Sequence, residues 1–191
     1  RALAPEAGLL VGMSLGGLTS IMVTAVAPDL VRSLLLVDVT PGVDHQKASA
    51  ITAFVNGPES FADFDEILAR TIEFNPTRTE SSLRRGILHN ALQREDGSWV
   101  WRYARFRGDE LPAEGQRFDY DALWGAVGAI AVPVTLARGM RSQSVVDDAD
   151  EAELLRRQPT ARIERFAESG HRIQGDQPVE LARLIDALLE G

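Results

Sequence analysis

The stretch of sequence that decides the fold is LLVGMSLGG at residues 9–17, an apolar run that ends in the pattern G-x-S-x-G. The run is typical of a buried strand, and residues 18–27 that follow it are apolar almost all round, as in a buried helix. A serine on a tight turn between such elements takes strained backbone angles, so glycines must flank it where strand and helix cross. The pattern therefore predicts that Ser14 is a nucleophile.

The main chain of the same turn predicts a second function. Leu15 would be the first residue of the helix, where its amide is placed to donate to a developing oxyanion. Glycine-rich turns also bind phosphate, but the sequence has neither a G-x-G-x-x-G pattern nor the lysine of a P-loop at this point. A glycine-rich turn with an incidental serine is the alternative interpretation.

Composition limits the partners. The chain has 191 residues, 45% of them hydrophobic, which is typical of a globular protein with a real core. A formal charge of -8 disfavours nucleic acid and anionic membrane surfaces, so we expect a small-molecule substrate, with no nucleic-acid and no membrane partner. The absence of cysteine excludes disulfides and thiolate metal sites, and it suits a cytoplasmic protein. We expect no metal and no organic cofactor, and nothing in the sequence predicts the oligomeric state.

Strands and helices alternate at both ends of the chain. A continuous apolar run predicts a buried strand at residues 33–39, and the alternating pattern predicts further strands at 132–137 and 162–166, with helices at 150–157 and 178–189. This alternation predicts an α/β fold with a doubly wound, mainly parallel sheet, formed by residues 1–43 and 129–191. Residues 44–128 are helical in pattern, at 46–55, 61–73 and 80–93, and we expect them to form a helical cap or lid insertion.

In this order, the motifs resemble those of the α/β-hydrolase-fold serine hydrolases. The residues that carry the resemblance are the turn at 12–16, the strand end at 36–39, the strand at 132–134 that leads into Arg138-Gly139, and Ser169-Gly170-His171. In that family several strands precede the nucleophile, and a loop among them supplies the other oxyanion donor. Because the turn lies close to the start of this sequence, we expect those strands to be absent from it, as in a fragment or one half of a two-chain protein.

The resemblance also implies a base and an acid. His171 lies in the loop where the family keeps its catalytic histidine, whereas His45 either lines the pocket or is exposed, and His89 is expected on a solvated helix face. The acid commonly stands in a G-x-x-D turn, but here that position is Ser142. Some members carry it at the end of the strand after the nucleophile helix, where this chain has Asp38.

Other interpretations of the acidic residues remain open. Asp38 is either the acid or an ordinary strand-end residue that caps a turn. Asp147 and Asp148 are alternative acids, although they are better placed to cap the helix near Asp150. Ser14, His171 and Asp38 together predict acyl transfer with Leu15 in the oxyanion hole.

We therefore expect a carboxylesterase-like hydrolase of small or medium esters, thioesters or lactones. The alternatives are a carbon-carbon bond hydrolase, a cofactor-free perhydrolase and a non-catalytic, receptor-like member that binds ligands, which the missing acid at Ser142 favours. Arg84 and Arg85 either bind an acidic substrate group or lie on a solvated helix face. Four aromatic residues either form an acyl pocket or the core of the cap: Trp99, Trp101, Phe106 and Trp124.

Overall fold

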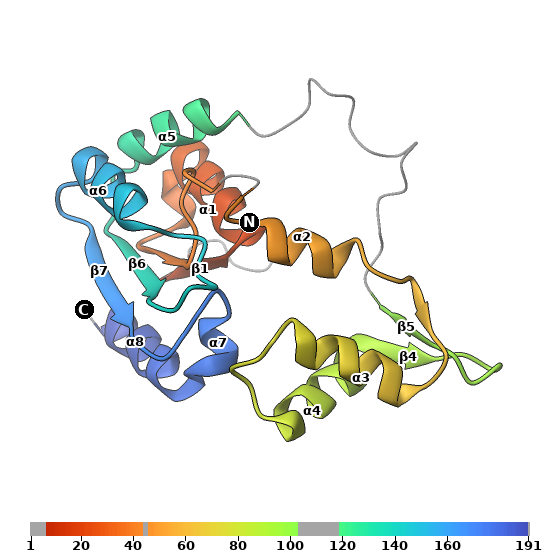
Figure 1. Ribbon diagram of the computed structural model, residues 1–191. Helices are drawn as coiled ribbons and strands as arrows, with labels where there is room; N and C mark the ends of the chain where they lie inside the picture. Colours follow the sequence, from red (N-terminus) through yellow and green to blue (C-terminus); the bar gives the residue numbers. More distant parts are fainter. Residues whose placement is uncertain (1–6, 44–45, 103–118, 191) are drawn as a thin grey trace. The chain divides into compact units, whose positions relative to one another are not determined.

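The computed structural model describes residues 7–43, 46–102 and 119–190. The chain divides into two compact units, one formed by Arg1–Ala48 and Phe118–Gly191 and the other by Ser49–Arg117 (Figure 1). Each unit has a hydrophobic core of its own. Over the ranges described, no helix has both the length and the apolar composition needed to cross a membrane.

The first unit is built on a sheet of four parallel strands in the order β1-β2-β6-β7. Its elements are β1 (Leu10–Met13), α1 (Leu15–Val26), the 3-10 helix η1 (Pro28–Leu30), β2 (Leu34–Val37), α5 (Tyr120–Ala129), β6 (Val134–Gly139), α6 (Asp148–Arg157), β7 (Arg162–Phe166), α7 (Ile173–Asp176) and α8 (Pro178–Glu190). This arrangement confirms the predicted α/β class. Because all four strands are parallel, their carboxyl ends lie along one edge of the sheet.

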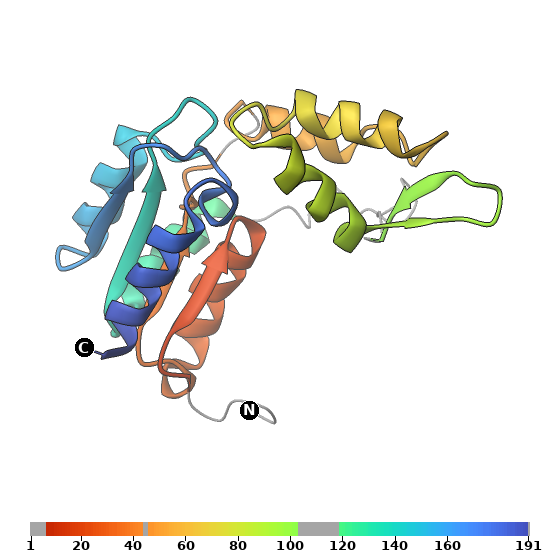
Figure 2. The same cartoon turned by 90° about the horizontal axis from the view of Figure 1, so that it is seen from below.

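Helices cover both faces of the sheet. Every residue of β2 is buried, as a strand packed on both sides requires. Leu34 and Leu36 belong to the core cluster formed with α1, α5 and α6, whereas Leu35 and Val37 pack with α7 and α8. Figure 2 shows α8, in dark blue, in front of the sheet and roughly along the direction of its strands.

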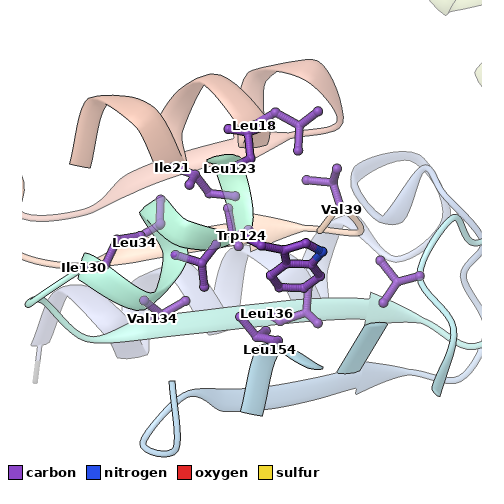
Figure 3. Close-up of a cluster of buried hydrophobic side chains, with 13 residues drawn as sticks. Leu18, Ile21, Leu34, Val39, Leu123, Trp124, Ile130, Val134, Leu136 and Leu154 are labelled. Carbon is purple, nitrogen blue, oxygen red and sulfur yellow. The ribbon is translucent and has the colours of Figure 1, made fainter. Parts of the chain in front are cut away.

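Helix α5 corrects the expected boundary of the insertion. The sequence pattern predicts that the cap extends to residue 128, but α5 belongs to the first unit. Its Leu123, Trp124 and Val127 are buried in the same cluster as α1 and β6, as Figure 3 shows for the Trp124 indole. The apolar face of α5 is buried against this core, and Asp119 caps the start of the helix by accepting the Ala122 amide. Trp124 is therefore a core residue of the sheet unit.

The second unit contains helices and a small antiparallel sheet. Its elements are α2 (Ser49–Val55), β3 (Ser60–Phe61), α3 (Phe64–Glu73), α4 (Glu80–Asn90), β4 (Ala91–Gln93) and β5 (Trp99–Trp101). The strands lie in the order β3-β5-β4. The helical pattern of the sequence missed this sheet. Gly97, with a φ of 87°, lies in the connection between β4 and β5, and a glycine after an aspartate at such a place is a hairpin signal.

Strand β1 and helix α1 cross at very close range. A Cβ added at Gly17 would lie 2.3 Å from Val39 Cγ1 and 3.0 Å from the carbonyl oxygen of Gly12. A Cβ at Gly12 would lie 2.6 Å from Gly17 Cα. Gly16, by contrast, has nothing within 4 Å of its would-be Cβ. The turn around Ser14 therefore requires glycine at positions 12 and 17 for steric reasons that do not apply at position 16.

Helix α6 begins with an acidic turn that also anchors Lys47. Asp147 and Asp150 form a reciprocal capping box, in which each carboxylate accepts the other residue's amide at 2.9 and 3.0 Å. The Lys47 ammonium donates to Asp150 at 2.7 Å and lies 2.9 Å from Asp147. Burial lowers the pKa of Lys47, but the hydrogen bonds to the two carboxylates outweigh it and leave that pKa raised. The Lys47 hydrogen bond likewise holds the pKa of Asp147 below its ordinary value.

We expect Gly17→Ala to lower the free energy of unfolding by about 2 kcal/mol, because its methyl group overpacks the contact with Val39. Gly16→Ala, the matched control, should leave stability unchanged or raise it by up to about 1 kcal/mol through helix propensity. Urea denaturation of the full-length protein measures both. Equal effects of the two substitutions would contradict the steric account.

Lys47→Met should lower the free energy of unfolding by about 1 kcal/mol at neutral pH. A carboxylate whose folded pKa is depressed contributes stability above its unfolded pKa of about 3.9 and loses it as the pH falls through the folded value. The difference from the parent protein should therefore narrow below about pH 4. Thermal unfolding across this pH range measures it, with Lys47→Arg as the charge-preserving control. A difference that stays constant with pH would refute the ion-pair account.

Candidate active site

Residues from all four strand ends converge on the carboxyl edge of the main sheet. Ser14 directly follows β1, and Asp38 directly follows β2. Gly139 ends β6, and His171 lies in the loop between β7 and α7. In parallel α/β sheets this edge is where ligands bind. The predicted nucleophile, acid and base therefore lie along the same edge of the sheet, after β1, β2 and β7.

Ser14 occupies the strained turn that the sequence predicts. Its φ is 51° and its ψ is -128°, a conformation that residues with a side chain rarely adopt. Its main-chain N–H donates to Val37 O at 3.5 Å, which continues the pairing of β1 with β2 up to the turn. Leu15 is the first residue of α1, and the first amides of a helix have no acceptor within it. The start of α1 can therefore donate to a negative oxygen beside Ser14.

Asp38 is completely buried and is held at both carboxylate oxygens. Oδ1 accepts the Gly139 amide at 2.8 Å and the Ser144 hydroxyl at 2.6 Å. Oδ2 accepts the Val145 amide at 3.1 Å and lies 3.0 Å from His171 Nδ1. The residue itself has a φ of 47°. Ser14 and Asp38 are the non-glycine residues with positive φ in the described part of the chain.

The contact with Asp38 fixes the roles of the two imidazole nitrogens. A carboxylate oxygen only accepts hydrogen bonds, so Nδ1 of His171 carries the hydrogen in this pair. Nε2 is then the nitrogen that can accept a proton. His171 is 7% exposed, and Asp38 is 0% exposed, so little water competes for their hydrogen bond.

The loop that carries His171 is fixed by hydrogen bonds to side chains at the junction of α7 and α8. The Gly170 amide donates to Asp176 Oδ2 at 3.1 Å. The Ser169 hydroxyl donates to Gln177 Oε1 at 3.0 Å, which also accepts the Glu168 amide at 3.0 Å. These side-chain acceptors fix a segment that has no regular secondary structure of its own. They were not singled out in the sequence, where nothing distinguishes them from surface residues.

The alternative acids have other partners. Asp147 caps α6 and pairs with Lys47, as described above. Asp148 accepts from Arg138 at 2.7 Å, and Arg138 also donates to Glu151 at 2.7 Å. Arg138 and Glu151 are both 8% exposed, so this pair joins β6 to α6 inside the protein. Of the three candidate acids, Asp38 is the one that the structure brings to His171.

The remaining candidates lie away from this edge or outside the described residues. His89 is exposed in the last turn of α4, and Arg85 is exposed on the same helix. Arg84 donates to Glu80 at 2.7 Å. Trp99 and Trp101 pack against the core cluster of the second unit. His45 and Phe106 fall outside the described residues.

Comparisons with known proteins agree with this architecture. Residues 1–184 match the family model described as the alpha/beta hydrolase family. The esterase Rv0045c of Mycobacterium tuberculosis is 42% identical over 197 residues, a match that covers 100% of this chain and 63% of that protein. A solved structure of that esterase has a TM-score of 0.82 at 40% identity and is covered to 65%.

A second solved structure, that of E-2-(acetamidomethylene)succinate hydrolase, has a TM-score of 0.83 at 26% identity. This chain is covered completely, and the match spans 69% of that chain. The chain thus spans about two thirds of the length of these relatives. The family match over nearly its whole length and the parallel sheet lead to one conclusion: the chain belongs to the alpha/beta hydrolase family.

Proposed function

We propose that this protein is a serine hydrolase that cleaves a small or medium ester-like substrate through an acyl-enzyme on Ser14. The observation that carries the proposal is the 3.0 Å contact between His171 Nδ1 and the buried Asp38 carboxylate, at the sheet edge where Ser14 lies on its strained turn. The similarity to a mycobacterial esterase supports the same reaction class. Ester, thioester and lactone substrates share the chemistry that these residues perform.

In the proposed reaction, Nε2 of His171 takes the proton of the Ser14 hydroxyl while Oγ attacks the carbonyl carbon. The carbonyl electrons move to the oxygen, which receives a hydrogen bond from the Leu15 amide. When the tetrahedral intermediate collapses, the alcohol leaves with the proton from Nε2. Water then attacks the acyl-enzyme by the same route and releases the acid. Asp38 accepts Nδ1–H throughout and stabilises the imidazolium.

The second unit supports a proposal for substrate selection. It is inserted after β2, and the chain enters it from the strand end that carries Asp38. We propose that it acts as the cap of the enzyme and selects the acyl or alcohol group.

The formal charge of -8 supports a small-molecule substrate over nucleic acid. The absence of cysteine supports a cytoplasmic location.

A fluorophosphonate probe tests the nucleophile directly. The full-length protein should be labelled at one serine and should hydrolyse p-nitrophenyl esters, whereas Ser14→Ala should abolish labelling and lower kcat by at least about 1,000-fold, because the hydroxyl forms the covalent intermediate. Thermal unfolding verifies that the variant is folded. A folded parent protein that neither labels nor hydrolyses esters would favour a ligand-binding member of the family instead.

Substitution of the acid tests the proposed triad. Asp38→Asn should lower kcat by about 1,000-fold or more, because the amide does not stabilise imidazolium and favours the wrong tautomer. Asp147→Asn is a matched control, because asparagine caps a helix as well as aspartate does and the fold is retained. Steady-state kinetics of both variants measure the effect. A loss of kcat in Asp147→Asn equal to that in Asp38→Asn would assign the role of the acid to Asp147, at the start of α6.

A further inference from the structure

The loop between β6 and α6 supplies donors to Asp38 from three successive points. The Gly139 amide reaches Oδ1 at the start of the loop, and the Val145 amide reaches Oδ2 near its end. Between them, the Ser144 hydroxyl donates to Oδ1 at 2.6 Å, the shortest of these contacts. The two amides belong to the backbone and do not depend on the identity of a side chain. Among the described side chains, Ser144 and His171 are those that bind the carboxylate.

The Ser144 hydroxyl is itself fixed in place. Its oxygen accepts the Val146 amide at 3.1 Å, so the single hydroxyl hydrogen is free to point at Asp38. The alternative acceptor for that hydrogen, the Val146 carbonyl oxygen, lies farther away at 3.2 Å. A charged acceptor also gives the stronger hydrogen bond. The geometry therefore favours donation to the carboxylate.

Asp38 needs hydrogen bonds of this kind because its backbone conformation is unfavourable. A φ of 47° is costly for a residue with a side chain and persists only when the surroundings determine it. Without the hydroxyl, Oδ1 keeps one donor, and the carboxylate plane can turn about the bond to Cβ. Oδ2 would then leave the direction in which it meets His171 Nδ1–H. A hydrogen bond weakens steeply as its angle departs from linear.

We propose that Ser144 is a positioning residue of the active site, whose hydroxyl locks the plane of the Asp38 carboxylate so that Oδ2 orients His171. The inference rests on the proposed function, because it assigns Ser144 a role through the acid and base named there. The loop after β6, which lacks a carboxylate at Ser142, thus holds the acid of the neighbouring strand instead of carrying an acid itself. Ser144 does not touch the substrate and acts through Asp38.

Three variants of the full-length protein test this role. Ser144→Ala removes the hydroxyl, Ser144→Thr keeps it, and Ser142→Ala removes an exposed hydroxyl of the same loop as a control. We expect Ser144→Ala to lower kcat by about 10-fold, the factor that corresponds to one hydrogen bond to a charged group, and to leave KM within about twofold. Ser144→Thr should recover most of kcat, and Ser142→Ala should match the parent protein. Fluorophosphonate labelling should slow in parallel with kcat.

Proton NMR provides a readout that does not depend on turnover. The Nδ1 hydrogen of His171, bonded to a buried carboxylate, should give a low-field signal in the parent protein and in Ser142→Ala, and Ser144→Ala should shift or broaden it. An unchanged signal and an unchanged kcat in Ser144→Ala would overturn the positioning role. A loss of kcat with a matching rise in KM, or one that Ser144→Thr does not restore although it folds, would also overturn it. If the parent protein shows the signal but no hydrolysis, the proposed function fails while the positioning role is still decided by the signal.

Discussion

A carboxylate without any exposed surface is the constraint on which the rest of the site depends. Removing Asp38 from water costs far more free energy than any one contact returns, so every lone pair of its oxygens needs a donor. Two backbone amides, a hydroxyl and an imidazole supply these donors. Because they come from β6, the loop after it and the loop after β7, satisfying one buried charge fixes the relative positions of three strands.

Backbone strain marks the same place. In the described ranges, positive φ at a residue with a side chain occurs at Ser14 and Asp38, which follow adjacent strands of the sheet. Such conformations cost free energy and are retained only where the surrounding packing is strong. Here the fully buried strand β2 and the close crossing of Gly12 and Gly17 provide it. The strain therefore lies beside a fully buried strand and a close backbone crossing, which suits residues that must hold a fixed geometry.

The sequence predicts well what local chemistry decides. The turn at Ser14 can be predicted from the sequence because the close crossing requires glycines within a few residues of the serine. Strand β2 can be predicted because a strand buried on both faces is continuously apolar. The antiparallel sheet of the second unit was missed because β4 and β5 are very short, and the helical pattern of their surroundings dominates. The contact of Ser144 with Asp38 spans 106 positions in the chain, and no local pattern encodes such a pairing.

The long sequence separation of these contacts also has a kinetic consequence. The hydrogen bonds that hold Asp38 join residues 101 to 133 positions apart, across the whole inserted unit. Contacts of this kind form late, because the entropy of closing a long loop is lost before they contribute any stability. A folding intermediate with β1, α1 and β2 in place would already present the Ser14 turn, but it would hold the Asp38 carboxylate without its hydrogen-bond partners. The hydrolytic activity proposed above should therefore arise only with the docking of β6 and β7, which makes it a late reporter of folding.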